Sequence, residues 1–502
     1  MTEPTSASAA EDLATWSRRW SRQWWDPQVH LAFNPSGSFG ALVPPRTVHL
    51  VPQSAWVAYG LLGSADPADH REAEAAIDAL LALQYDTPGT VFHGTFARFL
   101  EAPYPPDAPV MWEDYDPNWR QFVGTTMALM LEDFPDRLSD PRRAEMFGAI
   151  QLACEGEVAE GRLGPSYANP ALMHAWLDGW CGRRRTDAAQ VERAERFAAS
   201  IVDRFDRCGA FDEFNSPTYY GIDLYALALW RTFPPTQRFA DDGARLEAAV
   251  WHEAALFHHA GLVNFCGPYT RSYGPDATAT VTLIALWIWA AFGRSVAPLP
   301  DIDEDVIDHG HDLLAGPVVA RLVRAPRDGG DRASFGRFTG AREIQQELPG
   351  GRFVTAALFD DLMIGGEASA NDWGGWDQFM PAVAHWREDD GVGVLWLVDP
   401  RKVRASVSGR VLALEVERPG GPAQLDLMIS APACAVRGAE VRAGRVQIAS
   451  SKDPVDVQIE QIGDRLHRIA MKPVDADTAV LRCALAFTVM SSAGAPEPTL
   501  GP

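Results

Sequence analysis

Apolar residues recur with a helical period from the start of the chain to about residue 315. The segments begin near Asp, Asn, Ser or Pro and contain few β-branched runs, as amphipathic or buried helices do. We therefore expect about eleven helices, mostly in consecutive pairs. Their expected ranges are 13–25, 53–62, 70–84, 118–134, 141–155, 169–180, 188–205, 218–230, 241–258, 276–292 and, with a weaker pattern, 303–314.

After about residue 316 the pattern changes to short runs in which apolar and polar positions alternate. Gly, Pro and Asp separate these runs, which follow one another at intervals of about ten residues, a spacing typical of antiparallel sandwiches. The expected strands lie at 318–325, 352–359, 362–368, 393–399, 403–417, 423–430, 445–450, 455–462 and 466–472.

These two patterns predict a multidomain α and β protein. Residues 13–315 are expected to form an (α/α) toroid of five or six helix pairs around a catalytic cleft, and residues 316–490 an antiparallel β-sandwich. An acidic, Pro-containing segment at 297–305 marks the junction. Residues 1–12 and 491–502 are small, polar and Pro-containing, so we expect disorder there.

Composition narrows the class of protein. Hydrophobic residues make up 47% and charged residues 22% of the 502, as in globular proteins. The net charge of −23 argues against a nucleic-acid partner, because phosphate backbones require clustered Lys and Arg. No apolar stretch reaches the roughly 18 residues of a membrane span, and the first residues show no signal peptide. We expect a cytoplasmic protein with six scattered, reduced Cys; self-association is left open.

The densest group of reactive side chains precedes the helix expected at 218–230. Ser216, followed by Pro217, is expected to cap this helix, whose amino terminus would favour an anion or a phenolate. The alternative, in which the tyrosines only pack between helices, remains open. The group comprises two acids, an amide and two phenols: Asp212, Glu213, Asn215, Tyr219 and Tyr220.

A second group combines aromatic rings with carboxylates before the helix expected at 118–134. Asp116 and Asn118 occupy positions where helix caps occur, which accounts for one of them without any function. Aromatic rings interleaved with acids and amides suit sugar rings, whose apolar faces stack while their hydroxyls are hydrogen-bonded. The remaining members are His93, Trp112, Glu113, Asp114, Tyr115 and Trp119.

A third group lies in the connection before the helix expected at 276–292, which Asp276 would introduce. Arg271 has the planar guanidinium that binds a carboxylate through two hydrogen bonds, as a uronate substrate requires. Tyr269 and Tyr273 either donate protons or pack.

Polar and aromatic residues also interrupt the strand pattern at 367–386. Such a loop could complete the cleft of the toroid through Trp373 and Trp376, or these rings could fill a domain interface. A cation held by Asp372, Asp377 and His385 is not supported by spacing. The chain shows no GxGxxG, GxxxxGK[ST], HExxH or GxSxG motif. We therefore expect neither a metal nor an organic cofactor.

The layout of the chain resembles that of the heparinase II/III-like polysaccharide lyases, which join a toroid to a β-sandwich. Tyr219 or Tyr220 looks like the tyrosine that these lyases use as acid or base. Asn169, in Ser-Tyr-Ala-Asn-Pro, is similar to their Asn near a helix start. In those lyases it helps to neutralise the substrate carboxylate.

The first functional hypothesis is therefore a lyase that cleaves a uronate-containing saccharide by β-elimination. This reaction needs a group that neutralises the carboxylate, a base for the C5 proton and an acid for the leaving oxygen. Asn169 and Arg271 are assigned to the carboxylate. Tyr219 or Tyr220 is assigned to acid and base catalysis together with His93.

Three alternatives remain. An inverting glycoside hydrolase would use Glu213 or Asp212 as acid and Asp116 or Asp114 as base. A cofactor-free isomerase, dehydratase or cyclase would act on a terpenoid-like small molecule, and a glycan-binding protein would catalyse nothing. Thirteen of the 17 Trp precede residue 290 and four fall within 373–396, which suggests the walls of one cleft. The net negative charge favours a small, neutral or singly charged substrate.

Overall fold

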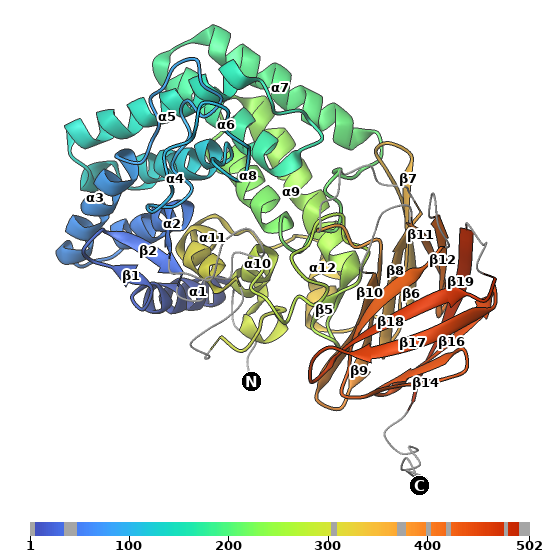
Figure 1. Ribbon diagram of the computed structural model, residues 1–502. Coiled ribbons are helices and arrows are strands. Elements are labelled where there is room, and N and C mark those ends of the chain that lie inside the picture. Colours follow the sequence, from blue (N-terminus) through green and yellow to red (C-terminus); the bar gives the residue numbers. More distant parts are fainter. Residues whose placement is uncertain are drawn as a thin grey trace. The chain divides into compact units, whose positions relative to one another are not determined.

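The computed structural model describes residues 6–34, 48–302, 309–368, 378–397, 403–417, 423–475 and 480–490 of the chain. It divides into two compact units. The first unit comprises residues up to 206, then 218–251 and 278–326; the second comprises 207–217, 252–277 and the residues from 327 on. Helices dominate the N-terminal region and antiparallel sheets the C-terminal region, which confirms a multidomain α and β protein (Figure 1).

The helices of the N-terminal region follow the predicted periodicity closely. Short 3-10 helices η1 (Pro135–Arg137), η2 (Arg294–Val296) and η3 (Gly310–Ala315) lie between them, and β1 (Trp25–Asp26), β2 (Leu31–Asn34) and β3 (Val48–Leu50) form a small sheet. The α-helices are α1 (Ser6–Ser21), α2 (Val51–Leu62), α3 (Pro67–Leu81), α4 (Trp119–Asp133), α5 (Asp140–Glu160), α6 (Ala168–Arg185), α7 (Ala188–Asp206), α8 (Tyr220–Thr232), α9 (Gln237–Phe257), α10 (Leu283–Phe292) and α11 (Gly316–Leu322).

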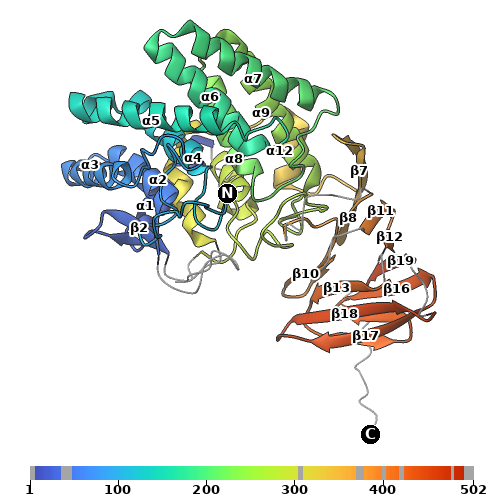
Figure 2. The ribbon, with the colours of Figure 1, turned by 45° about the horizontal axis from the view of Figure 1, so that its top comes forward.

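Burial separates these helices into two classes. Helices α2, α4, α6, α8 and α10 bury nearly every residue, as their continuous apolar and small-residue sequences require. Helices α3, α5 and α7 bury one side only, with apolar residues three or four apart. Helices α2, α4, α6, α8 and α10 are therefore internal, whereas α3, α5 and α7 are peripheral (Figures 1 and 2).

The internal helices contact one another in a closed cycle. Helix α2 packs on α4, α4 on α6, α6 on α8 and α8 on α10, and α1 completes the cycle between α10 and α2. Across the interior, the Tyr225 hydroxyl donates a hydrogen bond to Thr125 Oγ1 at 3.0 Å. Helix α11 contacts α1, α2 and α10, so the last helix of the unit packs on the first.

The internal helices start at the same end of this cycle. Asn118, just before α4, reaches Tyr167, just before α6, at 3.1 Å. Gly221 lies against Leu283, at the start of α10, where a Cβ atom would overlap the leucine. Because one antiparallel peripheral helix separates successive internal helices, their amino termini gather together. We call residues 116–120, 162–169 and 219–221 the amino-terminal rim.

Two antiparallel sheets make up most of the second unit (Figure 2). The eight-stranded sheet has the order β17-β18-β13-β10-β9-β8-β7-β6, and the six-stranded sheet β11-β12-β19-β16-β15-β14. The unit also contains the pair β4 (His258–His259) and β5 (Asn264–Phe265), and α12 (Gly329–Gly336). The strands are β6 (Arg342–Leu348), β7 (Arg352–Leu358), β8 (Leu362–Glu367), β9 (Ala382–Glu388), β10 (Gly391–Leu397), β11 (Val403–Ser408), β12 (Val411–Glu417), β13 (Leu425–Ser430), β14 (Cys434–Arg437), β15 (Glu440–Ala443), β16 (Val446–Lys452), β17 (Val455–Gln461), β18 (Leu466–Pro473) and β19 (Val480–Val489).

One hydrophobic core serves both sheets. It combines Trp386 and Leu395 of the eight-stranded sheet with Leu414, Leu485 and Phe487 of the six-stranded sheet. The inward-facing side chains of the alternating strands meet in this cluster, as in two sheets packed face to face.

Two segments have a different secondary structure from the one expected, and no element was predicted where α12, β6, β14, β15 and β19 lie. Residues 318–325 were expected to be a strand, but α11 occupies most of them because Pro317 sits at a first-turn position that favours a helix. Residues 381–386 were expected to interrupt the strands, whereas β9 begins at Ala382 and is buried on both faces. A doubly buried strand does not alternate, so its polarity pattern was misleading.

Some boundaries also differ. Helix α1 begins at Ser6, inside the segment 1–12 that was expected to be disordered. Helix α10 begins at Leu283, so Asp276 does not cap it; Asp276 Oδ1 instead accepts a hydrogen bond from Asn264 at 2.7 Å. In the segment 303–314, where a weak helix was expected, residues 310–314 belong to η3. Residues 303–308 lie outside the described residues, and so does the tail 491–502.

None of the six Cys, all of which the structure describes, forms a disulfide. Among the described helices, none has the length and hydropathy that crossing a lipid bilayer would demand.

Candidate active site

A tight contact between a loop and α5 fixes His93 beside the amino-terminal rim. Gly156 in α5 lies against the carbonyl oxygen of His93, where a Cβ atom would overlap that oxygen. Gly94, with a positive φ of 76°, lies equally close to the backbone of Leu152. Gly94 in the loop and Gly156 in α5 therefore let the loop and the helix approach each other at backbone distance.

His93 has a defined orientation in this loop. Its Nδ1 accepts a hydrogen bond from the backbone N–H of Thr87 at 3.1 Å, and Asp86 lies 3.9 Å from the same atom. The carbonyl of His93 accepts from Arg120 Nε at 3.0 Å. Because Nδ1 is an acceptor, the neutral imidazole carries its proton on Nε2, which is the tautomer that donates a proton from that atom.

Asp116 and Asn118 begin α4, but only one of them acts as a local cap. Asp116 Oδ1 accepts from the backbone N–H of Asn118 at 2.9 Å, and its carbonyl accepts from Thr95 Oγ1 at 2.6 Å. The Asn118 side chain makes no cap hydrogen bond. It donates to the Tyr167 hydroxyl at 3.1 Å and accepts from Arg162 Nη2 at 2.8 Å. The expected cap is thus a bridge between a phenol and a guanidinium.

A buried charge network supports this bridge. Arg162 Nη2 lies 3.2 Å from Glu157 Oε2, which also accepts from Gln121 at 3.0 Å. Arg120, which is fully buried, pairs with Glu157 at 3.4 Å and with Glu160. Two cations and two carboxylates balance one another, and the hydrogen bonds make the cluster a rigid support rather than a surface ion pair.

Aromatic side chains lie next to the rim. Tyr104 is 64% exposed and packs edge-on against Phe92 at 5.7 Å between ring centroids. Phe92 in turn contacts the buried Tyr115 at 6.2 Å. Trp112 and Trp119 are half-buried. Tyr104, Trp112 and Trp119 thus keep ring surface in contact with solvent, the property that stacking on a sugar requires.

The other residues predicted in the first unit lie at helix starts or in a loop. Asn169 is buried in the first turn of α6, after the N-cap position, and Tyr220 is the first residue of α8. Tyr219 precedes it and is half-buried. Asp114 Oδ2 accepts from the backbone N–H of Val110 at 2.7 Å and so shapes its loop.

The second unit holds Glu213 and Arg271, whose side chains form an ion pair with each other. Glu213 is fully buried and Arg271 is 4% exposed, and Arg271 Nε also donates to Gln378 at 2.9 Å. The guanidinium that was expected to bind a substrate carboxylate therefore binds a protein carboxylate. Ser216, expected to cap α8, instead donates to the Arg271 carbonyl at 2.6 Å.

Neighbouring residues of the second unit also have structural contacts. Asn215, with a φ of 46°, donates from Nδ2 to the carbonyls of Cys266 and Pro268 at 2.7 and 2.8 Å. The Tyr269 hydroxyl donates to the Phe265 carbonyl at 2.6 Å, and burial raises the pKa of this phenol. Tyr273 is 46% exposed.

A second buried ion pair lies close to Asp212. Arg352 contacts both carboxylate oxygens of Glu367, at 2.8 and 3.0 Å, and donates to the Asp212 carbonyl at 2.9 Å. This bidentate pair ties the 207–217 segment to β7 and β8 inside the second unit.

The structure bears on only one residue of the cation site considered at 372–385. Trp373, Trp376, Asp372 and Asp377 lie outside the described residues. His385 is fully buried in β9, where its Nε2 donates to the Pro275 carbonyl at 2.7 Å.

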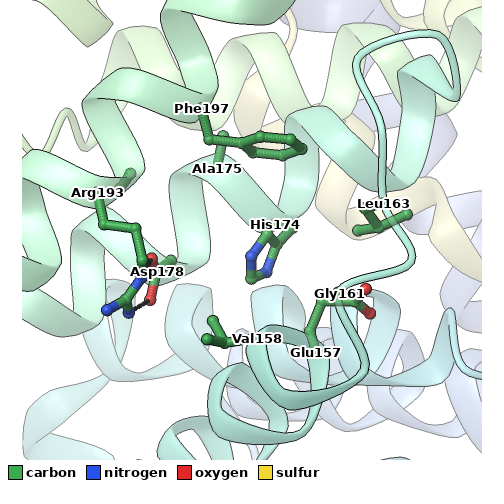
Figure 3. Close-up of a pocket in the computed structure, with 10 residues that line it drawn as sticks. Glu157, Val158, Gly161, Leu163, His174, Ala175, Asp178, Arg193 and Phe197 are labelled. Carbon is green, nitrogen blue, oxygen red and sulfur yellow. Dashed lines mark hydrogen bonds and ion pairs between the residues drawn. The ribbon is translucent and has the colours of Figure 1, made fainter.

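Glu157 also lines a small pocket of about 150 Å³ between α5, α6 and α7 (Figure 3). His174 borders the same pocket, and burial lowers the pKa of its imidazole. Within the described residues, Glu157 Oε1 and His174 Nδ1 have no hydrogen-bond partner. Asp178 and Arg193 pair at 2.7 Å on the pocket wall. The glutamate whose carboxylate supports the rim therefore also borders this pocket.

Sequence reasoning missed Arg162, Tyr167, Arg120 and Glu157. Arg162 and Tyr167 flank the short connection Leu-Gly-Pro-Ser before α6, and Arg120 and Glu157 lie inside helices that look amphipathic. One signal was available: Tyr167 and Asn169 both fall at a predicted helix start, the same position as Asn118.

Three solved structures are similar to this chain in part. Heparinase III has a TM-score of 0.45 and 10% identity, covering 88% of this chain and 76% of that one. Heparan sulfate lyase HepC from Pedobacter heparinus has a TM-score of 0.33 and 10% identity, and the match covers 89% of this chain and 76% of that one. Endoglucanase CelQ from Clostridium thermocellum, complexed with cellotriose, has a TM-score of 0.32 and 11% identity, and the match covers 99% of this chain and 93% of that one. Because all three scores lie below 0.5, we base the proposed function on residues of this chain.

No curated protein matches the chain. One family model does, over residues 11–324, a range that contains helices α2 to α11. This match covers more than half of the chain, and it includes the whole amino-terminal rim. The chain belongs to the family DUF8769, described as a domain of unknown function.

Proposed function

We propose that this protein is a carbohydrate-active enzyme, a lyase that cleaves a uronate-containing saccharide by β-elimination at the amino-terminal rim. One observation carries the proposal: the Asn118 amide joins the Arg162 guanidinium to the Tyr167 hydroxyl. A cation, an amide and a phenol thus meet where internal helices begin. These are the groups that neutralise a carboxylate and move a proton next to it.

The helix starts supply the electrostatic part of this mechanism. Helix amino termini carry partial positive charge and favour an anion, so the uronate carboxylate would bind near α4 and α6 with Arg162 and Asn118. Asn169 lies in the first turn of α6 and belongs to the same end. Withdrawal of charge from the carboxylate makes the C5 proton more acidic, which is the difficult step of β-elimination.

Proton transfer falls to the phenols and to His93. Tyr167, or Tyr219 or Tyr220 at the start of α8, would take the C5 proton as a phenolate. The electron pair then forms the double bond between C4 and C5, and the C4–O bond breaks. The tyrosine would then pass the proton that it has taken to the leaving oxygen and return to the phenolate, while the Nε2–H of His93 would donate a hydrogen bond to that oxygen.

The fold proposed with this function is an (α/α) toroid joined to a β-sandwich. The closed cycle of internal helices, each followed by a peripheral helix, supports five or six helix pairs within 13–315. The core shared by the two sheets supports the sandwich within 316–490.

The hydrolase alternative fits less well. Glu213, its expected acid, is fully buried and paired with Arg271, so it has no surface to offer a glycosidic oxygen. Asp116, one of its expected bases, accepts the Asn118 backbone N–H at the start of α4.

The test is a screen of uronate-containing oligosaccharides, followed by ultraviolet absorbance of the unsaturated product and by reducing-end release. Tyr167→Phe and Asn118→Ala are expected to lower kcat/KM by at least about 100-fold. Tyr59→Phe is the matched control, because it also removes a phenol, one that bonds Asp133 at the far end of α4. Release of reducing ends without any unsaturated product would reject the lyase proposal and favour the hydrolase.

A further inference from the structure

A second cluster of side chains, separate from the amino-terminal rim, lies near the end of the helical unit. His309, His311 and Asp312 each present a ligand atom, and these three atoms lie within 4.8 Å of one another. The sequence places them in the motif His-Gly-His-Asp at the start of η3. Because a 3-10 helix has three residues per turn, positions 309 and 312 fall on the same side.

The surroundings of the cluster hold η3 against α1. Ser17 Oγ donates to the Leu313 carbonyl at 2.6 Å, and Trp20 Nε1 donates to the Gly310 carbonyl at 3.1 Å. His309 has a left-handed backbone with a φ of 54°, which turns its ring back towards His311, 5.5 Å away between centroids. Backbone and packing thus position the three side chains together.

The cluster has the charge and access that a cation needs. The Asp312 carboxylate is 13% exposed and the His311 side chain 7%, so both are mostly removed from water yet still reachable. The closest approach of Asp312 to His311 is 3.6 Å, longer than a hydrogen bond. A carboxylate largely withdrawn from water is unfavourable without a compensating charge.

The donor set decides which cation fits. Two imidazole nitrogens and one carboxylate oxygen are typical ligands of zinc and related transition metals, whereas Mg²⁺ and Ca²⁺ prefer oxygen donors throughout. With metal–ligand distances of about 2.0–2.2 Å, tetrahedral donors lie about 3.4 Å apart. The observed separations of up to 4.8 Å therefore need shifts of about 1.5 Å or less, within reach of side-chain rotation.

We propose that His309, His311 and Asp312 bind one divalent transition metal ion of the zinc class. Water completes the coordination. The metal fastens the end of the helical unit to its beginning, because η3 leads into α11 and both pack on α1. No disulfide closes the cycle of helices, so a metal bound only by the folded state would stabilise that closure.

The test uses the full-length chain after treatment with a chelator. Zn²⁺ is titrated by calorimetry, and unfolding is followed with and without the ion. We expect one Zn²⁺ per chain and a higher melting temperature, with no effect of Mg²⁺ at the same concentration. Co²⁺ is expected to give the visible absorption bands of a nitrogen- and oxygen-ligated ion of low coordination number.

Two variants and one control assign the ligands. Asp312→Asn and His311→Ala are each expected to weaken Zn²⁺ binding by about 100-fold. The double variant His252→Ala, Asp331→Asn removes another contacting His and Asp, 2.8 Å apart, which belong to no group of three donors in the described part of the chain. This variant should bind Zn²⁺ normally.

Unchanged Zn²⁺ affinity in both ligand variants, or a stoichiometry of zero in the native chain, would overturn the proposal. If either variant fails to fold, as judged by circular dichroism, the Co²⁺ spectrum of the native chain decides. Absence of ligand-field bands there rejects the site.

Discussion

At the scale of single residues, several polar side chains bind distant partners where the sequence predicted local ones. Asn118 and Ser216 both stand at expected cap positions. The Asn118 side chain instead bonds Tyr167 and Arg162, and the Ser216 side chain bonds the Arg271 carbonyl. Capping statistics identify the position of such a residue but not its partner. The pairing of Glu213 with Arg271, 58 residues apart, likewise has no local signal.

The candidate site was therefore predicted only in part. Asn118, Asn169 and the tyrosines at 219 and 220 were correctly placed near helix starts, because helix periodicity fixes those starts. Arg162 and Tyr167 were missed because each stands alone in a Gly- and Pro-containing connection. The His-Gly-His-Asp motif at 309–312 was also overlooked, since its donors converge only once the segment adopts a 3-10 turn.

One prediction at this scale concerns His385. Burial is the main cause that lowers its pKa from 6.5 to about 4; nearby Asp276 opposes the shift and His259 adds to it. Between these pH values His385 binds a proton more readily in the unfolded chain than in the folded one. The stability that the neutral, buried His385 contributes is therefore fully present above about pH 6.5 and is lost as the pH falls towards 4. This shift in pKa corresponds to about 3 kcal/mol of unfolding free energy.

This prediction is checked by chemical denaturation between pH 4 and 7. His385→Gln is expected to flatten the dependence of the unfolding free energy on pH for the second unit. The same substitution at His252, which is 59% exposed, controls for the loss of a histidine. An unchanged pH dependence in His385→Gln would contradict the assignment.

At the scale of elements, long periodic helices were recovered and short ones were not. Helices α4, α6 and α7 lie within a few residues of their predicted ranges, since many repeats of the apolar pattern define each. Helix α11 has only seven residues, too few to repeat a helical pattern clearly, and β9 is buried on both faces, so its polarity does not alternate. Tertiary packing decided both cases.

The contact between α5 and the loop before α4 gives a prediction at this scale. Gly156→Ala would push its Cβ into the His93 carbonyl oxygen and is expected to destabilise the protein by about 1–3 kcal/mol, because the backbone must move. Gly148→Ala, in the same helix with open space around it, should instead stabilise by about 0.5–1 kcal/mol.

Denaturant titration of both variants measures these changes. The Gly156 variant should also lose activity, since its clash displaces His93, whereas the Gly148 variant should keep it. Equal effects of the two substitutions on stability would mean that the loop does not depend on this close approach.

At the scale of the whole molecule, the net charge of −23 opposes the binding of any anionic polymer. At the proposed site the helix amino termini would be a local exception, because their partial positive charge favours an anion. A short uronate saccharide gains the local attraction while its few charges meet little of the general repulsion. A long polyuronate meets both.

This balance predicts how chain length and salt act together. At low ionic strength, short uronate oligosaccharides should have a higher kcat/KM than the corresponding polymer. Raising the ionic strength to about 0.15 M shortens the screening length to about 8 Å and should narrow that difference. Steady-state kinetics at two salt concentrations measures this difference in kcat/KM. A higher kcat/KM for the polymer than for the oligosaccharides at low salt would contradict the electrostatic argument.

Identification of the product decides whether β-elimination takes place at the amino-terminal rim. The native chain, Tyr167→Phe and Tyr59→Phe are incubated with the uronate oligosaccharide that the screen selects, and the product is examined by ultraviolet absorbance and by nuclear magnetic resonance. We expect a C4–C5 double bond in the product of the native chain and of Tyr59→Phe, and at least about 100-fold less of this product with Tyr167→Phe. A saturated product, or full activity in Tyr167→Phe, Tyr219→Phe and Tyr220→Phe alike, would contradict it.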